Sequence, residues 1–216
     1  MTKLLKIVLL SFAYLFVGNA QASTVTFYGD TVKFILDDTL TLFGSPSVSG
    51  DYLNFQPVDF EASAVGGSAS LVSDSVKIKV QALNPQNFID KATFSESGFY
   101  TSFGDSTMLA GGQLLATSGS ESTSMLIGDG PFDTTGFATS NWSSNALLDV
   151  SAWGASEITL TISNLLFSTS SIGGFAAIQK TFASLNVTAV PLPASIWLLG
   201  AALIGLISST KRRQTI

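Results

Sequence analysis

Apolar and polar positions alternate with a period of two along the middle of this chain. In residues 75–81 every second side chain is apolar, and residues 157–163 repeat the pattern. Successive side chains of a strand point to opposite faces, so this pattern is typical of strands with one buried face. Shorter stretches of the same kind predict further strands at residues 24–28, 31–36, 39–43, 52–55, 88–94, 99–103, 107–116, 124–127, 146–152 and 176–187.

Clusters of Gly, Ser, Asp and Pro separate most of these stretches and predict turns. They lie at residues 44–46, 66–68, 84–85, 95–98, 128–131 and 170–174. A helical period never lasts for more than about two turns, so the pattern predicts an all-β fold. We expect an antiparallel β-sandwich with jelly-roll or Greek-key connections. Its core is predicted to include Phe27, Phe94, Phe103, Phe167 and Phe182.

The first residues follow a different pattern. Two lysines precede an apolar stretch at residues 7–17, and Ala20 and Ala22 then frame a small-x-small site. This order is typical of a secretory signal peptide, which signal peptidase removes. The sequence therefore predicts a signal peptide at residues 1–22, with cleavage after Ala22.

The last residues contain a second apolar segment. Residues 196–207 carry no polar side chain and lie in a predicted transmembrane helix at residues 194–210. At ~1.5 Å per residue this helix spans about 25 Å, just short of a hydrocarbon core of about 30 Å, which suits a temporary anchor. A basic stop follows at Lys211, Arg212 and Arg213. Because basic residues at both ends favour the cytoplasm, the body at residues 23–189 is predicted to be exported.

A proline-rich motif at residues 190–195 precedes this helix. Its prolines fix two φ angles, so the segment is extended and accessible to a processing enzyme. The motif residues are Val190, Pro191, Leu192, Pro193 and Ala194.

Together with the apolar helix and the basic end of residues 190–216, this motif resembles the PEP-CTERM protein-sorting signal in its Val-Pro-Leu-Pro-Ala variant. Leu192 stands where the family's core Pro-Glu-Pro motif has Glu. The resemblance implies recognition and removal of the tail by an exosortase, an integral-membrane enzyme of Gram-negative bacteria that usually also make extracellular polysaccharide. The sortase signal Leu-Pro-x-Thr-Gly is not matched, because Ser195 and Ile196 replace its last two residues.

The composition narrows the function of the body. It holds all 15 acids, five lysines and no arginine, which gives a net charge of −10. This charge argues against nucleic acid or anionic lipid as a partner. The chain has no Cys and no His, so disulfides, Ser-His-Asp triads and thiolate or imidazole metal sites are excluded. We therefore expect no enzyme activity and no cofactor.

Three groups of residues remain as candidates for chemistry. Trp142 and Trp153 are candidates for stacking on sugars. Asp129 and Asp133 are candidate Ca²⁺ ligands, although two turn aspartates fall short of a calcium motif. A carboxylate glycosidase would need two acids that converge in a cleft, and Glu96, placed in a predicted hairpin loop, is expected to be a solvated charge.

The sequence thus predicts a non-enzymatic surface or extracellular-matrix protein of a Gram-negative bacterium, associated with exopolysaccharide or biofilm. It would be anchored in the inner membrane transiently and then reach the cell surface or matrix. The alternatives are a carbohydrate-binding module or adhesin and, second, a secreted glycosidase.

Overall fold

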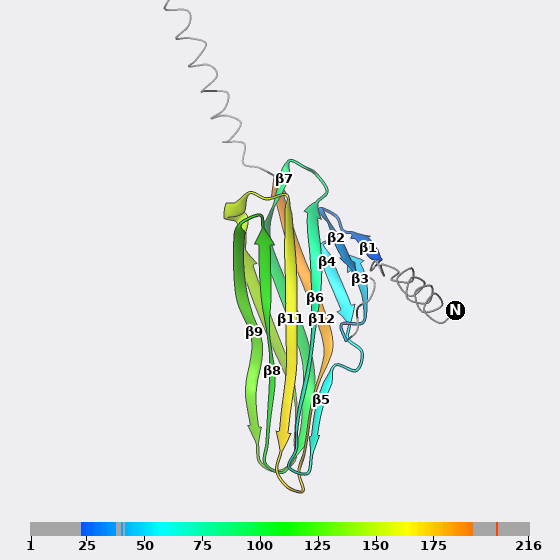
Figure 1. Ribbon diagram of the computed structural model, residues 1–216, viewed down its shortest axis with the longest axis vertical. Coiled ribbons are helices and arrows are strands. Elements are labelled where there is room, and N and C mark those ends of the chain that lie inside the picture. Colours follow the sequence, from blue (N-terminus) through cyan, green and yellow to red (C-terminus); the bar gives the residue numbers. More distant parts are fainter. Residues whose placement is uncertain (1–22, 38–39, 41, 192–201, 203–216) are drawn as a thin grey trace, which may run out of the picture.

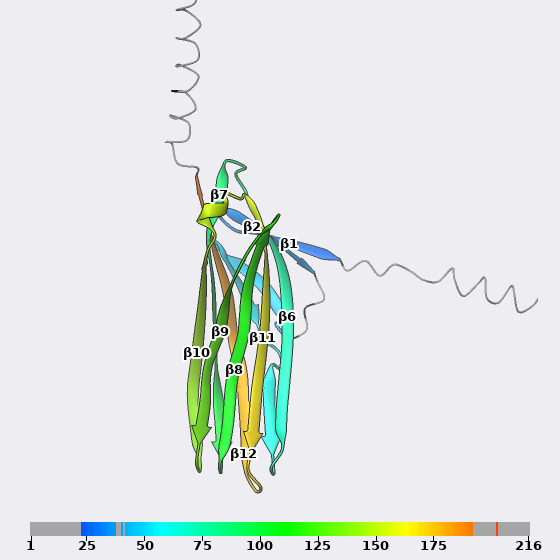
Figure 2. The ribbon, with the colours of Figure 1, turned by 60° about the vertical axis from the view of Figure 1, so that its left-hand side comes forward.

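Two antiparallel sheets of six strands each form a sandwich in the computed structural model, which describes residues 23–37, 40, 42–191 and 202. The first sheet runs in the order β1 (Thr24–Tyr28), β2 (Val32–Asp37), β6 (Ala69–Ala82), β11 (Glu157–Ser170), β8 (Ser106–Ser118) and β9 (Glu121–Thr134). The second runs in the order β10 (Ala138–Asp149), β7 (Asn87–Phe103), β12 (Phe175–Pro191), β4 (Tyr52–Gln56) and β3 (Ser45–Ser49), and β5 (Glu61–Val65) also pairs with β12. Figures 1 and 2 show the long strands of both layers running along the same direction.

Strands far apart in the sequence are neighbours in both sheets. β11 lies between β6 and β8, and β12 pairs with β7 from Phe175 to Pro191. These crossovers confirm the predicted antiparallel sandwich and show the strand order that the sequence left open. β11 and β12, the last two strands of the body, therefore lie in opposite sheets.

The period-two pattern matches the burial of the strands. On β11 the even-numbered side chains from Ile158 to Ser170 are buried, and the odd-numbered ones between them are not. The buried faces of the two sheets form one continuous core. Alternation in the sequence therefore identified the inward face of this strand correctly.

Two of the predicted turns are wrong because they lie inside long strands. The predicted strands 88–94 and 99–103 and the loop between them form the single strand β7. Residues 95–98 pair with β10 on one side and with β12 on the other, so two ladders of backbone hydrogen bonds override the local turn preference. Likewise, residues 128–131 lie in β9.

The predictions for the N-terminal part of the body are partly wrong. Residues 42 and 43 of the predicted strand 39–43 form a turn. The sequence missed β3, whose Pro46 is tolerated because β3 is an edge strand, and it also missed β5. β1, β2 and β4 agree with predicted strands to within two residues.

Of the five predicted core phenylalanines, Phe94 is fully buried, whereas Phe27 and Phe167 are half-buried. Phe103 and Phe182 are exposed, at 56% and 43%, which corrects the prediction. Phe103 is an odd-numbered residue of β7, whose even-numbered residues face inward from Ala92 on, and Phe182 lies at a bulge of β12. Phenylalanine content alone could not identify the face.

The predicted signal peptide at residues 1–22 lies outside the described residues. The same holds for the predicted transmembrane helix at residues 194–210, apart from residue 202. Within the described part of the chain, no helix combines the length and apolar character that crossing a membrane requires.

Candidate functional site

The proline-rich motif begins inside the sandwich. Val190 and Pro191 are the last residues of β12 and pair with Phe88 and Asn87 of β7. Pro191 is exposed at the end of this central strand. The other residues of the predicted processing and topology signals lie outside the described residues: Leu192, Pro193, Ala194, Ala20, Ala22, Lys211, Arg212 and Arg213.

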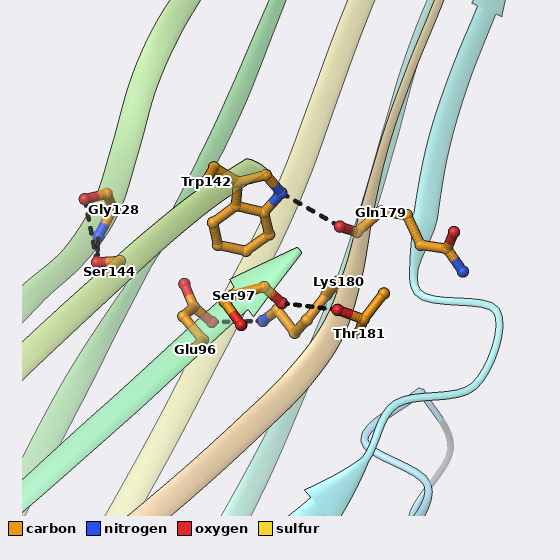
Figure 3. A network of polar contacts seen from close by, with 8 residues as sticks. All are labelled: Glu96, Ser97, Gly128, Trp142, Ser144, Gln179, Lys180 and Thr181. Atoms are coloured by element: carbon orange, nitrogen blue, oxygen red, sulfur yellow. Dashed lines mark hydrogen bonds and ion pairs between the residues drawn. The ribbon is translucent and has the colours of Figure 1, made fainter. Parts of the chain in front are cut away.

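Trp142, a candidate for sugar stacking, is buried at 2% exposure, which corrects that prediction. Its indole N–H donates a hydrogen bond to the carbonyl oxygen of Gln179 at 3.1 Å (Figure 3). The ring lies beside Gly98, where an added Cβ would overlap the Gln179 carbonyl and lie 2.8 Å from the indole nitrogen. Trp142 of β10 therefore packs beside Gly98 of β7 and reaches β12, and its buried ring cannot be presented to a sugar.

Trp153 lies in the short 3-10 helix η2 (Ser151–Trp153) and packs, half-buried, against the core. Neither of the two tryptophans thus forms an exposed ring on a sheet face. The feature that would have favoured a carbohydrate-binding module is missing from these positions.

Asp129 and Asp133 lie on β9 and are occupied by protein donors. Asp129 accepts hydrogen bonds from the backbone N–H of Gly130 at 3.0 Å and of Ser143 at 3.1 Å. Asp133 accepts one from the Thr107 hydroxyl at 2.6 Å. In the described part of the chain, no three acidic side chains gather as a metal site would require. The contacts of both aspartates stabilise strand edges.

The sequence missed a buried polar cluster in the core. Lys180 of β12 and Glu96 of β7 form an ion pair, with 2.6 Å between Nζ and Oε2. The two side chains are 0% and 1% exposed. Figure 3 shows them meeting between the strands, and the predicted solvated loop position of Glu96 is therefore wrong.

Lys180 faces the core as the last residue of the inward phase of β12 before a bulge. Before the bulge the even-numbered residues Ala176 and Ile178 are buried, and after it the odd-numbered Ala183 and Leu185 are. The register to β7 shifts between Lys180 and Phe182. Because of the bulge, even-numbered residues face inward before it, up to Lys180, and odd-numbered residues such as Ala183 face inward after it.

Asn164 of β11 faces the same interior from the opposite sheet. It is 3% exposed and continues the inward phase of Leu160 and Ile162. Its neighbours across the sheet are Asp74 of β6 and Gly112 of β8. A Cβ at Gly112 would lie 2.8 Å from the Asn164 amide nitrogen, so glycine leaves room for this side chain.

Burial controls the protonation of the pair. Desolvation raises the pKa of Glu96, and Lys180 and Asn164 oppose this only in part. Desolvation also lowers the pKa of Lys180, against the attraction of Glu96 and Asp74. Both shifts favour the neutral forms of the acid and the amine. The Lys180 Nζ also lies 4.3 Å from the ring centroid of Phe60 and 5.5 Å from that of Phe43.

The glutamates do not form a two-carboxylate cleft. Glu96 is enclosed in the core, whereas Glu61, Glu121 and Glu157 lie on β5, β9 and β11. Glu157 is bound on the surface by Lys79 and Gln81, which lower its pKa. The arrangement gives no support to the glycosidase alternative.

The PEP-CTERM protein-sorting motif matches residues 189–213 of the chain. It indicates export and surface sorting in Gram-negative bacteria and implies an exosortase as the processing partner. No curated protein sequence matches the chain.

Solved structures resemble the chain only weakly. TmCBM61 in complex with beta-1,4-galactotriose is 12% identical with a TM-score of 0.20, and the comparison covers 63% of this chain and 87% of that one. An infectious bursal disease virus Gx strain structure is 12% identical with a TM-score of 0.29, covering 86% and 59%. The enzymatically active domain of bacteriophage CBA120 tailspike protein 4 is 8% identical with a TM-score of 0.20, covering 57% and 19%. At these TM-scores the similarities carry no argument about ligand or activity.

Proposed function

From the PEP-CTERM protein-sorting motif that this chain carries at residues 189–213, we propose that the chain is a non-enzymatic protein of the cell surface or extracellular matrix. An exosortase would process its tail after export. The motif is the observation that carries this proposal. Its position supports the proposal, because β12 ends at Pro191, within the matched segment.

Removal of the tail beyond Pro191 would leave the sandwich complete. Ala189, Val190 and Pro191 pair with β7, so the strand needs nothing beyond them for its hydrogen bonds to that neighbour. A membrane-bound precursor would thus release a folded body, with no strand lost from either sheet.

The body offers polar groups for association with exopolysaccharide. On the edge strand β10 the side chains of Thr139, Asn141, Ser143 and Asn145 are exposed, and from Trp142 on exposed residues alternate with buried ones. Hydrogen bonds from these groups, or divalent cations bridging acidic surfaces, suit a body with a net charge of −10 and no arginine. We propose this association without stacking on Trp142, because that ring is buried.

The test is the mass of the protein recovered from the surface or medium of an exosortase-containing Gram-negative host. We expect the mature chain to begin at Ser23 and to lack the apolar tail. Substitution of both Pro191 and Pro193 by Ala should keep the protein membrane-bound with its C-terminus intact, because the extended motif is lost.

Pro85→Ala, in the turn between β6 and β7, is the matched control and should be processed normally. A wild-type chain that keeps its tail in this host would overturn the processing. Unchanged release of the double proline variant would show that these prolines are not needed for it.

A further inference from the structure

Three polar side chains from three strands meet where the core should be apolar. Lys180 of β12 and Glu96 of β7 are paired at 2.6 Å. Asn164 of β11 faces the same carboxyl, where burial raises the pKa and Asn164 opposes that rise in part. Neither the nitrogen nor the oxygen of the Asn164 amide forms a hydrogen bond of normal geometry, although both are buried. A buried amide without hydrogen-bond partners destabilises the fold, so its retention calls for a reason.

The surroundings suit a reaction between the amine and the amide. An amine is a nucleophile only when neutral, and burial favours the neutral form of Lys180. Burial likewise favours the protonated carboxyl of Glu96, which can then donate a proton to a neighbouring group. The rings of Phe60 and Phe43 border the Nζ atom. They help to exclude the water that would compete for the amide carbon.

We propose that Lys180 and Asn164 become joined by an intramolecular amide bond, with Glu96 as the proton-transfer residue. The Nζ atom of Lys180 attacks Cγ of Asn164, while the Glu96 carboxyl hydrogen-bonds the amide oxygen. Nζ then gives up one proton and the leaving nitrogen Nδ2 receives one, both through Glu96. The Nζ–Cγ bond forms, the Cγ–Nδ2 bond breaks and ammonia leaves, so Glu96 ends in its starting state.

The bond would connect the two sheets directly. Asn164 belongs to β11 of one sheet and Lys180 to β12 of the other. The chain has no cysteine, so a disulfide cannot provide such a link. A covalent tie between the layers would keep an exported body folded outside the cell. This inference does not depend on the proposed function, because the reaction needs only the folded chain.

Peptide mapping of the folded full-length wild-type chain tests the proposal. Chymotrypsin cuts between Asn164 and Lys180, after Leu166, Phe167 and Phe175 for example, so without the bond the two residues fall in separate peptides. We expect one joined species whose mass is lower than the sum of the two peptides by one ammonia, about 17 Da. Free, unmodified peptides from the folded wild-type chain would overturn the proposal.

Variants identify the residues. Lys180→Met and Asn164→Ala should abolish the joined species. Glu96→Gln should slow the formation of the joined species by about 100-fold or more, because proton transfer is lost. Glu157→Gln is the matched control, a glutamate whose ion pair with Lys79 lies on the surface, and should leave the joined fraction unchanged.

The wild-type map decides the existence of the bond even where a variant fails to fold. Circular dichroism shows which variants are folded. A folded Glu96→Gln variant that forms the joined species as fast as the wild type would overturn the role of Glu96.

Discussion

Two lysine–glutamate pairs of nearly equal length lie in opposite environments of this molecule. Lys180 and Glu96 are 2.6 Å apart in the core, and Lys79 and Glu157 are 2.7 Å apart on the outer face of the other sheet. The surface side chains are 43% and 47% exposed. Burial raises the pKa of Glu96, whereas hydrogen bonds from Lys79 and Gln81 lower the pKa of Glu157. Exposure to solvent, rather than the distance between the two side chains, therefore decides whether the pKa of the glutamate is raised or lowered.

The largest difference should appear when the glutamates are truncated. Glu96→Ala leaves Lys180 buried without its partner and should lower the free energy of unfolding by about 3–5 kcal/mol. Glu157→Ala removes an exposed pair that water and salt already screen, and should cost about 0.2–1 kcal/mol. Urea unfolding of the two variants measures both values. Equal losses would show that burial does not separate the pairs.

A double substitution in the core sharpens the comparison. Glu96→Leu with Lys180→Met removes both partners of the buried pair and keeps apolar volume, so the double variant should be more stable than either single variant by about 1–3 kcal/mol. The same exchange at Glu157 and Lys79 has no buried charge to relieve and should show coupling below about 1 kcal/mol. A double-mutant cycle by chemical unfolding gives both coupling energies. Strict additivity in the core would argue that the two charges do not interact.

How well the sequence predicts which polar side chains are buried differs between the strands. On β11 the alternation from Ile158 to Leu166 identifies the inward face, and it also contains the anomaly, because Asn164 occupies an inward position. On β7 Glu96 follows Ala92 and Phe94 in the same phase, but the neighbouring Ser and Gly residues resemble a turn. Only pairing on both sides, which depends on distant segments, shows that they continue the strand.

The meeting of the three residues could not be predicted. Their convergence depends on the strand order of two sheets, which local alternation does not encode. Trp142 shows the same limit, since its position beside Gly98 comes from the register of β10 on β7. The sorting motif, by contrast, needs no fold and was found from the sequence alone.

Acid should remove the contribution of the surface pair. The folded-state pKa of Glu157 is lowered, so its contribution is present above its ordinary value near 4.5 and is lost as the pH falls through the lowered value. The stability difference between wild type and Glu157→Gln should therefore shrink as the pH falls from 7 to below 4. Thermal unfolding across this range measures it. A difference that grows with acid would contradict the lowered pKa.

Salt should have the smallest effect, and it should act on only one of the pairs. At 1 M ionic strength the Debye length is about 3 Å, so the attraction between exposed charges such as Lys79 and Glu157 is largely screened. Their coupling energy, measured by a double-mutant cycle to Ala, should fall by a few tenths of a kcal/mol between low salt and 1 M NaCl. Ions cannot approach Glu96 and Lys180, which are 1% and 0% exposed, so the core coupling should change by less than the error of the cycle. Salt-dependent coupling in the core would mean that water and ions reach the cluster, and the contrast between the two pairs would then fail.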